Sequence, residues 1–288
     1  MAEQRPETKP AEFALDKRQL RAHFARAAGT YDRAAVLQRE IADRMLARLD
    51  VVKQIPETVL DAGCGTGYCT RALARRYPRA RLVGLDLAAP MAARARRAAG
   101  WFARPRFVCG DIEALPLPDA AIDLVASNLT LQWCDLARSL RELRRVLRPG
   151  GLLMFTSFGP DTLSELRTAW RTADAGVHVH AFLDMHDIGD ALLHAGFADP
   201  VMDVDRLTMT YPNVEQVLQD LKALGASNAA YGRARALTGK ARYARFKAAY
   251  EALARDGRIP ATYEVVYGHA WAPETARAAP VTFVRRPR

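Results

Sequence analysis

A chain of 288 residues, half of them hydrophobic, can bury a large core, and one domain, or one domain with an insertion, is expected. The formal net charge of +10 would attract acidic partners, but the arginines are scattered through alanine-rich segments and no nucleic-acid-binding module occurs, so nucleic-acid binding is not expected. The apolar runs are too short to span a bilayer, and the polar N-terminus lacks the apolar segment of a secretory signal. The four cysteines form no CxxC pair. Together these features predict a cytoplasmic protein with reduced thiols and no membrane partner.

The first segment of the chain is predicted to be a tail followed by helices. Residues 1–15 are expected to form a disordered tail. Over residues 16–50, apolar side chains recur at the three-to-four-residue spacing of a helix. Because a Gly-Thr pair at 29–30 interrupts this pattern, we predict two helices that join at Tyr31 and Asp32.

Strands and helices then alternate across residues 51–160, the predicted core. Each predicted strand is a short apolar run that ends in a turn or a polar residue. The strands are expected at 58–63, 81–86, 106–111, 122–128 and 152–158, and the helices at 66–77, 89–99 and 136–147. This alternation is typical of a doubly wound α/β fold with a mostly parallel sheet, whose ligand lies beyond the carboxyl ends of the strands.

The rhythm changes over residues 161–288. Helices are expected at 161–173, 185–197, 213–226 and 241–256, and strands at 201–211 and 261–272. The last two strands would complete a seven-stranded sheet. We expect the helices of this region to form a lid on the core rather than a separate domain.

The stretch VLDAGCGTG at 59–67 contains the most informative motif, a glycine loop directly after the first core strand. A dinucleotide-binding G-x-G-x-x-G pattern that starts at Gly63 would need glycine at position 68, where Tyr68 stands. The loop instead reads Asp61-x-Gly63-x-Gly65-x-Gly67. A pyrophosphate is disfavoured beside a carboxylate, whereas S-adenosylmethionine (SAM) carries a sulfonium and an amino group. The acidic loop therefore favours SAM over NAD.

Acidic residues also end the next two strands, at the spacing that a nucleoside needs. Asp86 could accept the ribose hydroxyls, Asp111 could accept the adenine amine, and the ring could lie between Met91 and Ile112. Taken singly, each aspartate could equally be a helix cap. Leu87 follows Asp86, and the segment after the fourth strand would pass the methionine moiety. The predicted SAM-binding residues are Asp61, Gly63, Gly65, Gly67, Asp86, Leu87, Met91, Asp111, Ile112, Asn128, Leu129 and Gln132.

Over residues 59–158 the motifs VLDAGCGTG, GLDLAAPM, GDIEALPLPD and LRELRRVLRPGG resemble those of class I SAM-dependent methyltransferases, which have a Rossmann-like fold. A narrower resemblance covers nearly the whole chain. The segments FARAAGTYDRAAVLQREIADRML, SNLTLQWC, LKALGASN and PATYEVVYG are similar to the malonyl-acyl-carrier-protein O-methyltransferases of biotin synthesis.

That resemblance implies methyl transfer from SAM to the free carboxylate of a malonyl thioester on acyl carrier protein or CoA, with S-adenosylhomocysteine as the second product. The methyl ester would then serve as a primer in biotin synthesis. FGPDTLSELR and the C-terminal third are also similar to mitochondrial complex I assembly proteins of this fold. Another small-acid or carbon methyltransferase, or a SAM-binding assembly factor or hydroxylase, is therefore an alternative.

A carboxylate acceptor is already ionised at neutral pH, so its methylation requires positioning and no general base. Accordingly, no catalytic base is predicted, and no histidine lies in a strand-end motif of the core. In the resembling family the N-terminal helices cover the SAM site, which makes Tyr31 the first candidate for contact with substrate. The full set of predicted substrate contacts is Tyr31, Arg26, His178, His180, Lys222 and Tyr263.

Two further features of the sequence bear on metal and partner binding. His178 and His180 have no cysteine or carboxylate at a recognisable ligand spacing, so no metal is predicted. The segment 233–247, RARALTGKARYARFK, is rich in lysine and arginine and has no acid. It is either a docking face for the acidic carrier protein or simply a solvated basic helix.

Overall fold

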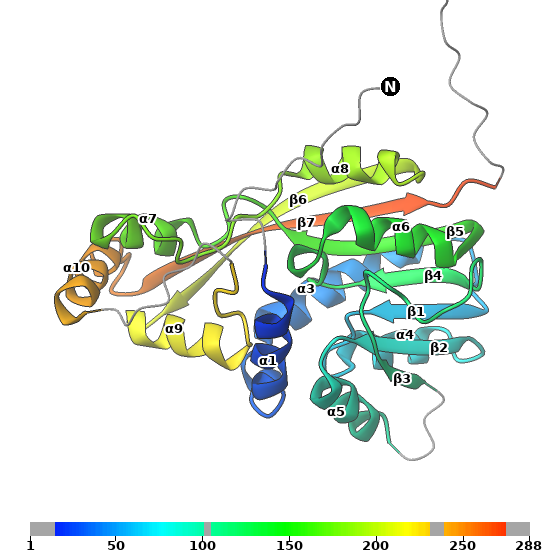
Figure 1. Cartoon of the computed structure of the whole chain (residues 1–288), viewed down its shortest axis with the longest axis horizontal. Coiled ribbons are helices and arrows are strands. Elements are labelled where there is room, and N and C mark those ends of the chain that lie inside the picture. The colour runs from blue at the N-terminus through cyan, green and yellow to red at the C-terminus, as the bar shows by residue number, and fades with distance from the viewer. Residues whose placement is uncertain (1–14, 101–104, 231–238, 275–288) are drawn as a thin grey trace, which may run out of the picture.

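The computed structural model describes residues 15–100, 105–230 and 239–274, and within them a seven-stranded sheet runs through the whole molecule in the order β3-β2-β1-β4-β5-β7-β6 (Figure 1). β7 is antiparallel to both of its neighbours, and the other strands are parallel to one another. The predicted tail lies outside the described residues except for its last residue, Leu15. The strands are β1 Thr58–Ala62, β2 Arg81–Asp86, β3 Arg106–Cys109, β4 Ile122–Ser127, β5 Leu147–Phe158, β6 Ala198–Tyr211 and β7 Ile259–Trp271.

The central strands are buried on both faces, which explains their continuous apolar runs. Successive residues point to opposite faces of the sheet. Val59 and Leu124 therefore pack in one apolar cluster with the helices α3 and α4, whereas Leu60 and Val125 pack in a second with α6 and α8. These helices are α3 Val36–Ala47, α4 Tyr68–Arg76, α6 Leu136–Val146 and α8 Met185–His194, and α5 Ala89–Ala99 adjoins β2 and β3.

Three helical pieces, rather than the two predicted, precede the sheet. They are α1 Lys17–Ala27, the single turn α2 Tyr31–Ala34, and α3, which the short 3₁₀ turn η1 Arg48–Val51 extends. Asp16 caps α1 by accepting a hydrogen bond from the Gln19 N–H at 3.1 Å. The chain leaves the helical conformation again at Ala35, whose ψ is 43°, and this breaks the predicted second helix into α2 and α3.

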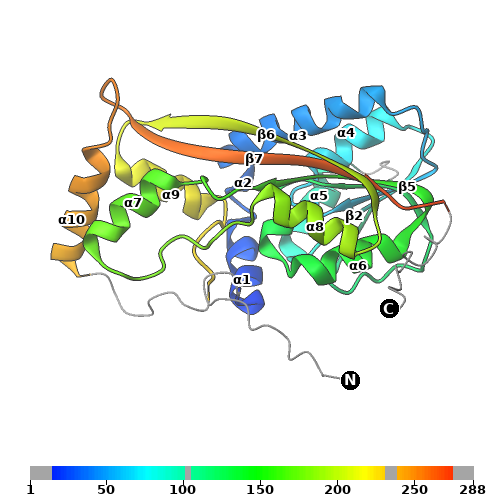
Figure 2. The same cartoon turned by 90° about the horizontal axis from the view of Figure 1, so that it is seen from above.

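The C-terminal region is built on a long antiparallel strand pair, β6 and β7, that continues past the end of the core (Figure 1, Figure 2). Three helices gather around the far end of this strand pair, whereas α8 lies flat on the sheet beside α6. The three are α7 Ser164–Ala173, α9 Val214–Ala223 and α10 Lys240–Glu251. Among the described residues, none of the helices has the length and apolar character needed to cross a membrane.

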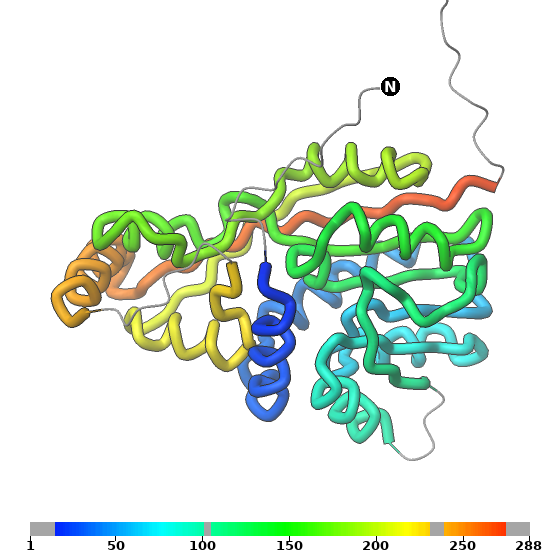
Figure 3. The backbone as a smooth tube through the Cα atoms, viewed as in Figure 1, coloured from blue at the N-terminus to red at the C-terminus, as the bar shows by residue number. Residues whose placement is uncertain are grey.

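The N-terminal helices and the C-terminal region lie side by side although they are far apart in sequence, as the blue and yellow segments of Figure 3 show. The Thr30 hydroxyl donates a hydrogen bond to the carbonyl of Ala223 at 2.9 Å. A Cβ on Gly225, whose φ is +73°, would lie 3.0 Å from the side chains of Ala27 and Phe24. This close approach seats α1 against the end of α9, next to the carboxyl ends of the core strands.

Candidate functional site

A cavity of about 890 Å³, its mouth included, lies at the carboxyl ends of β1, β2 and β4, where the strand order reverses. α1 and Tyr31 cover it from the N-terminal side. Ten of the twelve predicted SAM-binding residues line it. They are Gly63, Gly65, Asp86, Leu87, Met91, Asp111, Ile112, Asn128, Leu129 and Gln132. We refer to this space as the cofactor cavity.

Asp61 and Gly67, the other two predicted residues, lie differently. Asp61 lines an adjoining hollow that shares Gly63 and Gly65 with the cofactor cavity. Gly67 lines neither. A Cβ on Gly67 would lie 2.9 Å from the Cβ of Ala95, so this glycine allows α4 to pack closely on α5.

The first glycine of the loop has no room for a side chain. Gly63 has a φ of +82°, and a Cβ there would lie 2.0 Å from Oγ1 of Thr130. Its N–H donates to the carbonyl of Leu85 at 2.8 Å, which fixes the loop against β2. At Gly65, in contrast, the φ is +53° and nothing lies within 4 Å of the place that a Cβ would take. The backbone at Gly65 is therefore open toward a ligand.

Two buried carboxylates make this end of the sheet electronegative. Asp61 is 1% exposed and accepts a hydrogen bond from the Thr70 hydroxyl at 2.5 Å; burial, together with the nearby charge of Asp86, raises its pKa to about 7. Asp86 accepts hydrogen bonds from the N–H groups of Gly65 at 2.9 Å and Ala88 at 2.8 Å, but burial still raises its pKa to about 6. Within the described residues neither carboxylate forms an ion pair. A cationic ligand would relieve both.

Asp111, the third predicted acid, has a cation of the protein itself beside it. The ammonium of Lys17 on α1 pairs with Asp111 and, at 2.8 Å, with Glu113. These contacts bind α1 to the loop that follows β3. Asp111 thus serves the cavity wall and the attachment of its cover at once.

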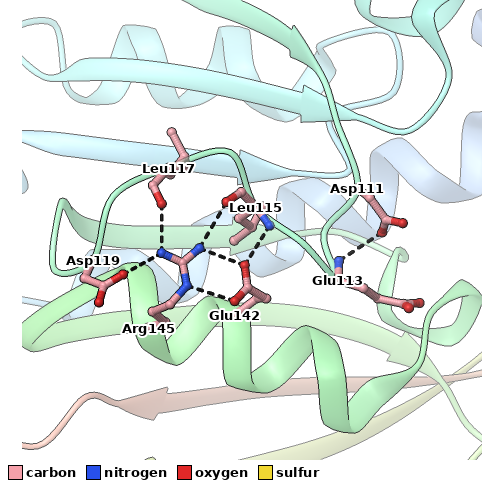
Figure 4. A network of polar contacts seen from close by, with 7 residues as sticks. All are labelled: Asp111, Glu113, Leu115, Leu117, Asp119, Glu142 and Arg145. Atoms are coloured by element: carbon pink, nitrogen blue, oxygen red, sulfur yellow. Dashed lines mark hydrogen bonds and ion pairs between the residues drawn. The ribbon is translucent and has the colours of Figure 1, made fainter.

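The loop after β3 is held in shape by one arginine of α6 (Figure 4). The guanidinium of Arg145 donates to the carbonyls of Leu115 at 3.0 Å and Leu117 at 2.8 Å, and it pairs with the carboxylate of Glu142 at 2.7 Å. Glu142 in turn accepts a hydrogen bond from the N–H of Leu115. The positions of Asp111 and Ile112 therefore depend on a network outside the cavity.

A second cavity of about 920 Å³ adjoins the first, and we refer to it as the acceptor cavity. α7, α9, β5 and β7 contribute to its walls, which are mostly apolar. Four of the predicted substrate residues line it: His178, His180, Lys222 and Tyr263. The two cavities meet at the residues that line both, namely Gln38, Trp133, Phe158, Leu224 and Ala226.

The predicted substrate residues differ in their surroundings. Tyr31 lines the cofactor cavity, and burial and the charge of Asp86 raise its pKa. The imidazole of His178 stacks on Trp170 at 3.7 Å between ring centroids and contacts Asp174 at 2.7 Å. Lys222 is exposed, and Tyr263 is 4% exposed. Arg26 is exposed at the end of α1 and lines neither cavity, so the structure gives no support to a substrate contact there.

The basic segment predicted as a docking face is used largely for internal contacts where the structure describes it. Residues 231–238 lie outside the described part. On α10, Arg242 pairs with Asp174 at 3.3 Å, and Lys247 pairs with Glu215 at 2.6 Å. Arg245 donates to the carbonyl of Ala173 at 3.0 Å. These contacts attach α10 to α7 and α9, so charge reversal there would also disturb the wall of the acceptor cavity.

Comparison with known proteins places this geometry in a family. The methyltransferase domain model matches residues 60–155. The chain is 53% identical to the malonyl-[acyl-carrier protein] O-methyltransferase of Methylovorus sp., over 93% of each chain, and 54% identical to the protein of that name from Laribacter hongkongensis, over 91% of each. The crystal structure of the YcgJ protein from Bacillus subtilis shares the fold, with a TM-score of 0.58 at 16% identity over 81% of this chain and 99% of that one.

The chain belongs to the malonyl-[acyl-carrier protein] O-methyltransferase family. It is a SAM-dependent methyltransferase of class I, as its motifs predicted. The predicted fold class is confirmed as well. Within the residues that the structure describes, no group of three or more His, Cys, Asp and Glu side chains lies together to hold a metal ion.

The residues of the cofactor cavity fit SAM. The carboxylates of Asp61 and Asp86 form no ion pair among the described residues, and the backbone at Gly65 is open. In addition, the side-chain oxygens of Gln38 and Gln132 are buried without a hydrogen-bond partner in the described structure. Both residues line the cofactor cavity. Buried acceptors without a donor are rare in native proteins, and the amine and hydroxyl donors of SAM would satisfy them. When bound, SAM supplies an electrophilic methyl carbon.

Sequence reasoning missed several residues of this cavity. Gln38 lies on α3 between the buried positions Leu37 and Ile41, and a polar residue beside an apolar helix stripe is the only signal that could have found it. Lys17 and Phe24 reach the cavity only because α1 folds back over the sheet. Trp133, an aromatic residue that the sequence does not distinguish from a core residue, lines both cavities.

Proposed function

We propose that this chain transfers the methyl group of SAM to the free carboxylate of a malonyl thioester carried by acyl carrier protein. The observation that carries the proposal is the identity of 53% to a malonyl-[acyl-carrier protein] O-methyltransferase over 93% of each chain. This similarity extends well past the methyltransferase domain at 60–155 and into the helices that line the acceptor cavity. The methyl ester that results is the form proposed to enter biotin synthesis.

The arrangement of the two cavities supports this reaction. A one-step displacement at a sulfonium methyl needs the acceptor oxygen aligned behind the methyl group. The five residues shared by the cavities mark the place where donor and acceptor would meet. The mostly apolar walls on the acceptor side suit the neutral arm of a thioester, and the exposed Lys222 suits an anionic group at the rim. Tyr31, His178, His180 and Tyr263 are proposed as further acceptor contacts.

No general base is needed for this acceptor. The two buried acids of the cofactor side carry raised pKa values, but they lie at the strand ends beside the glycine loop and line no part of the acceptor cavity. A malonyl carboxylate, with an ordinary pKa of about 4, would arrive ionised. Catalysis would then consist of holding one carboxylate oxygen in line while water is excluded by aromatic side chains such as Trp133 and Phe158.

The test follows the fate of a labelled methyl group. The full-length protein is incubated with methyl-tritiated SAM and with malonyl-, acetyl- or unloaded acyl carrier protein. We expect a label that is specific to the malonyl form and that base hydrolysis releases as methanol. A label that resists base, as a methyl on carbon does, or no transfer at all, would refute the proposal. Growth of a biotin auxotroph that lacks its own carboxyl methyltransferase, restored by this gene, is the matching test in cells.

A further inference from the structure

His180 carries an unpaired nitrogen in the wall of the acceptor cavity. Its side chain is 5% exposed, and its Nε2 has no hydrogen-bond partner within the described residues. The imidazole lies between two aromatic rings, 4.6 Å from that of Trp133 and 4.4 Å from that of Phe182, between centroids. It also borders a further cavity that reaches Gln132 and Cys134.

An unpaired nitrogen in such a place requires an explanation. Leaving a buried donor or acceptor without a partner costs about 1–3 kcal/mol, and native proteins rarely tolerate it outside functional sites. His178, two residues earlier in the same segment, shows the ordinary solution, because its Nε2 contacts the carboxylate of Asp174 at 2.7 Å. Within the described part of the chain, Nε2 of His180 has no such partner. The acceptor that the cavity would hold can supply one.

The surroundings of His180 keep its ring neutral. Burial, together with the nearby positive charge of Arg167, lowers the pKa of His180 to about 4. Arg167 is held nearby by hydrogen bonds to the carbonyls of Pro160 at 2.9 Å and Thr162 at 3.1 Å. A neutral imidazole carries one proton, which Nε2 can donate. Such a donor can orient a carboxylate without the strong charge pairing that would make the attacking oxygen a poorer nucleophile.

The position of His180 indicates that it would contact the carboxylate end of the acceptor. Its ring packs on Trp133, one of the five residues at which the two cavities meet and at which the methyl group must pass. The thioester and its long arm would extend away from that point, because the carboxylate must meet the methyl group there. The group nearest to His180 would thus be the carboxylate whose other oxygen attacks the methyl carbon.

We infer that His180 is a specificity-determining residue whose Nε2–H donates a hydrogen bond to the non-attacking carboxylate oxygen of the malonyl group. This inference rests on the proposed function. An acetyl thioester has no such oxygen and would leave His180 unpaired, so the same nitrogen that holds malonyl rejects acetyl. Sites built to hydrogen-bond one group discriminate strongly against analogues that lack it.

The experiment compares binding of two acceptors to the full-length protein with S-adenosylhomocysteine present, so that no turnover occurs. Malonyl-pantetheine and acetyl-pantetheine are titrated calorimetrically into the wild type, His180→Phe and His180→Gln. Phenylalanine keeps the ring without a donor, and glutamine places an amide N–H near the position of Nε2. His194→Phe, at an exposed position on α8, is the matched control. Thermal melts and the affinity for S-adenosylhomocysteine show whether each variant is folded.

We expect His180→Phe to weaken malonyl-pantetheine binding about tenfold or more and to change acetyl-pantetheine binding less than twofold, because one hydrogen bond to a charged carboxylate is lost. His180→Gln should recover at least part of the malonyl affinity, and His194→Phe should match the wild type. Equal loss for both acceptors in either folded variant, or no loss of malonyl affinity in a folded His180→Phe, would overturn the inference. If the wild type itself binds neither acceptor and methylates no malonyl thioester, the proposed function fails, and this inference fails with it.

Discussion

Replacing Asp61 with asparagine tests whether a buried, uncompensated carboxylate is what attracts the methyl donor. Asparagine keeps the shape of the side chain, and its carbonyl oxygen can still accept the hydrogen bond from Thr70. The folded-state pKa of Asp61, about 7, lies above its ordinary value of 3.8, because burial and the charge of Asp86 oppose ionisation. The stability that Asp61 contributes is therefore fully present below about pH 4 and is lost as the pH rises through 7.

The difference between these pKa values corresponds to at most about 4 kcal/mol. Because water in the adjoining hollow can relax around the charge, we expect the measured difference in the free energy of unfolding to be about 2 kcal/mol or more. The ligand-free variant should thus match the wild type near pH 4 and exceed its stability at pH 8, with a melting temperature higher by at least about 4 °C. At the same time it should bind SAM about tenfold more weakly, because one charge is missing.

Two measurements check this prediction. Denaturant unfolding of both proteins between pH 4 and 8 should show the wild type losing stability relative to the variant as the pH rises. Calorimetric titration of the wild type with SAM near pH 6.5, in two buffers of different ionisation enthalpy, should show proton release, because a bound cation favours ionised Asp61 and Asp86. Asp190→Asn, at an exposed position on α8, should change neither result. Equal stability of Asp61→Asn and the wild type at pH 8, together with unchanged SAM affinity, would refute the electrostatic reasoning.

Further substitutions test the steric fit of the glycine loop and the support of the loop after β3. Gly63→Ala would place a Cβ 2.0 Å from Oγ1 of Thr130, so it should lower the free energy of unfolding by more than about 2 kcal/mol and abolish SAM binding. In Gly65→Ala nothing lies within 4 Å of the new Cβ, so the free energy of unfolding should fall only by the roughly 1–2 kcal/mol that a left-handed backbone costs. Equal losses for the two variants in denaturant unfolding would contradict the steric argument. Arg145→Met should destabilise the protein by about 1–3 kcal/mol and raise the KM for SAM with little change in kcat, because the loop that carries Asp111 loses its support. Arg141→Met, exposed on the same helix, is the control, and an unchanged KM in Arg145→Met would show that the loop holds its shape without the arginine.

The core of the fold could be predicted because its signals are local. The strand β2 and the helix α5 begin and end at the predicted residues, and the strand-end acids fall at the edge of the sheet where parallel topology requires them. Boundaries set by tertiary contacts were less accurate. β5 begins at Leu147, five residues before the predicted start, because pairing with Ile122 of β4 extends it. β3 ends at Cys109, two residues before its predicted end at Asp111.

Residues brought to the site by the return of a distant segment could not be found in this way. Gln38 and Lys17 lie on helices whose sequences are ordinary for solvated or packed faces, and only the docking of α1 and α3 onto the strand ends brings them to the cavity.

Gly67 shows the opposite case, a motif residue that lines no part of the cavity. Its place in the motif suggested a ligand contact, but its neighbour is Ala95, so its lack of a side chain serves helix packing. A motif fixes the positions of glycines in the sequence and does not say what approaches each one.

The donor side and the acceptor side of the site therefore determine different properties of the enzyme. The donor side is built at the ends of β1, β2 and β4, within the residues that the methyltransferase domain model matches, so this side determines the class of cofactor and leaves the acceptor open. Most of the acceptor side is built from α7, α9 and β7, which lie beyond the methyltransferase domain match at 60–155. Identity of about half the residues to malonyl-[acyl-carrier protein] O-methyltransferases over 91–93% of the chain extends into the acceptor side. It follows that substitutions which redirect the enzyme to another acceptor should be sought at positions such as His180 and Lys222, because changes in the glycine loop would remove the methyl donor for every acceptor alike.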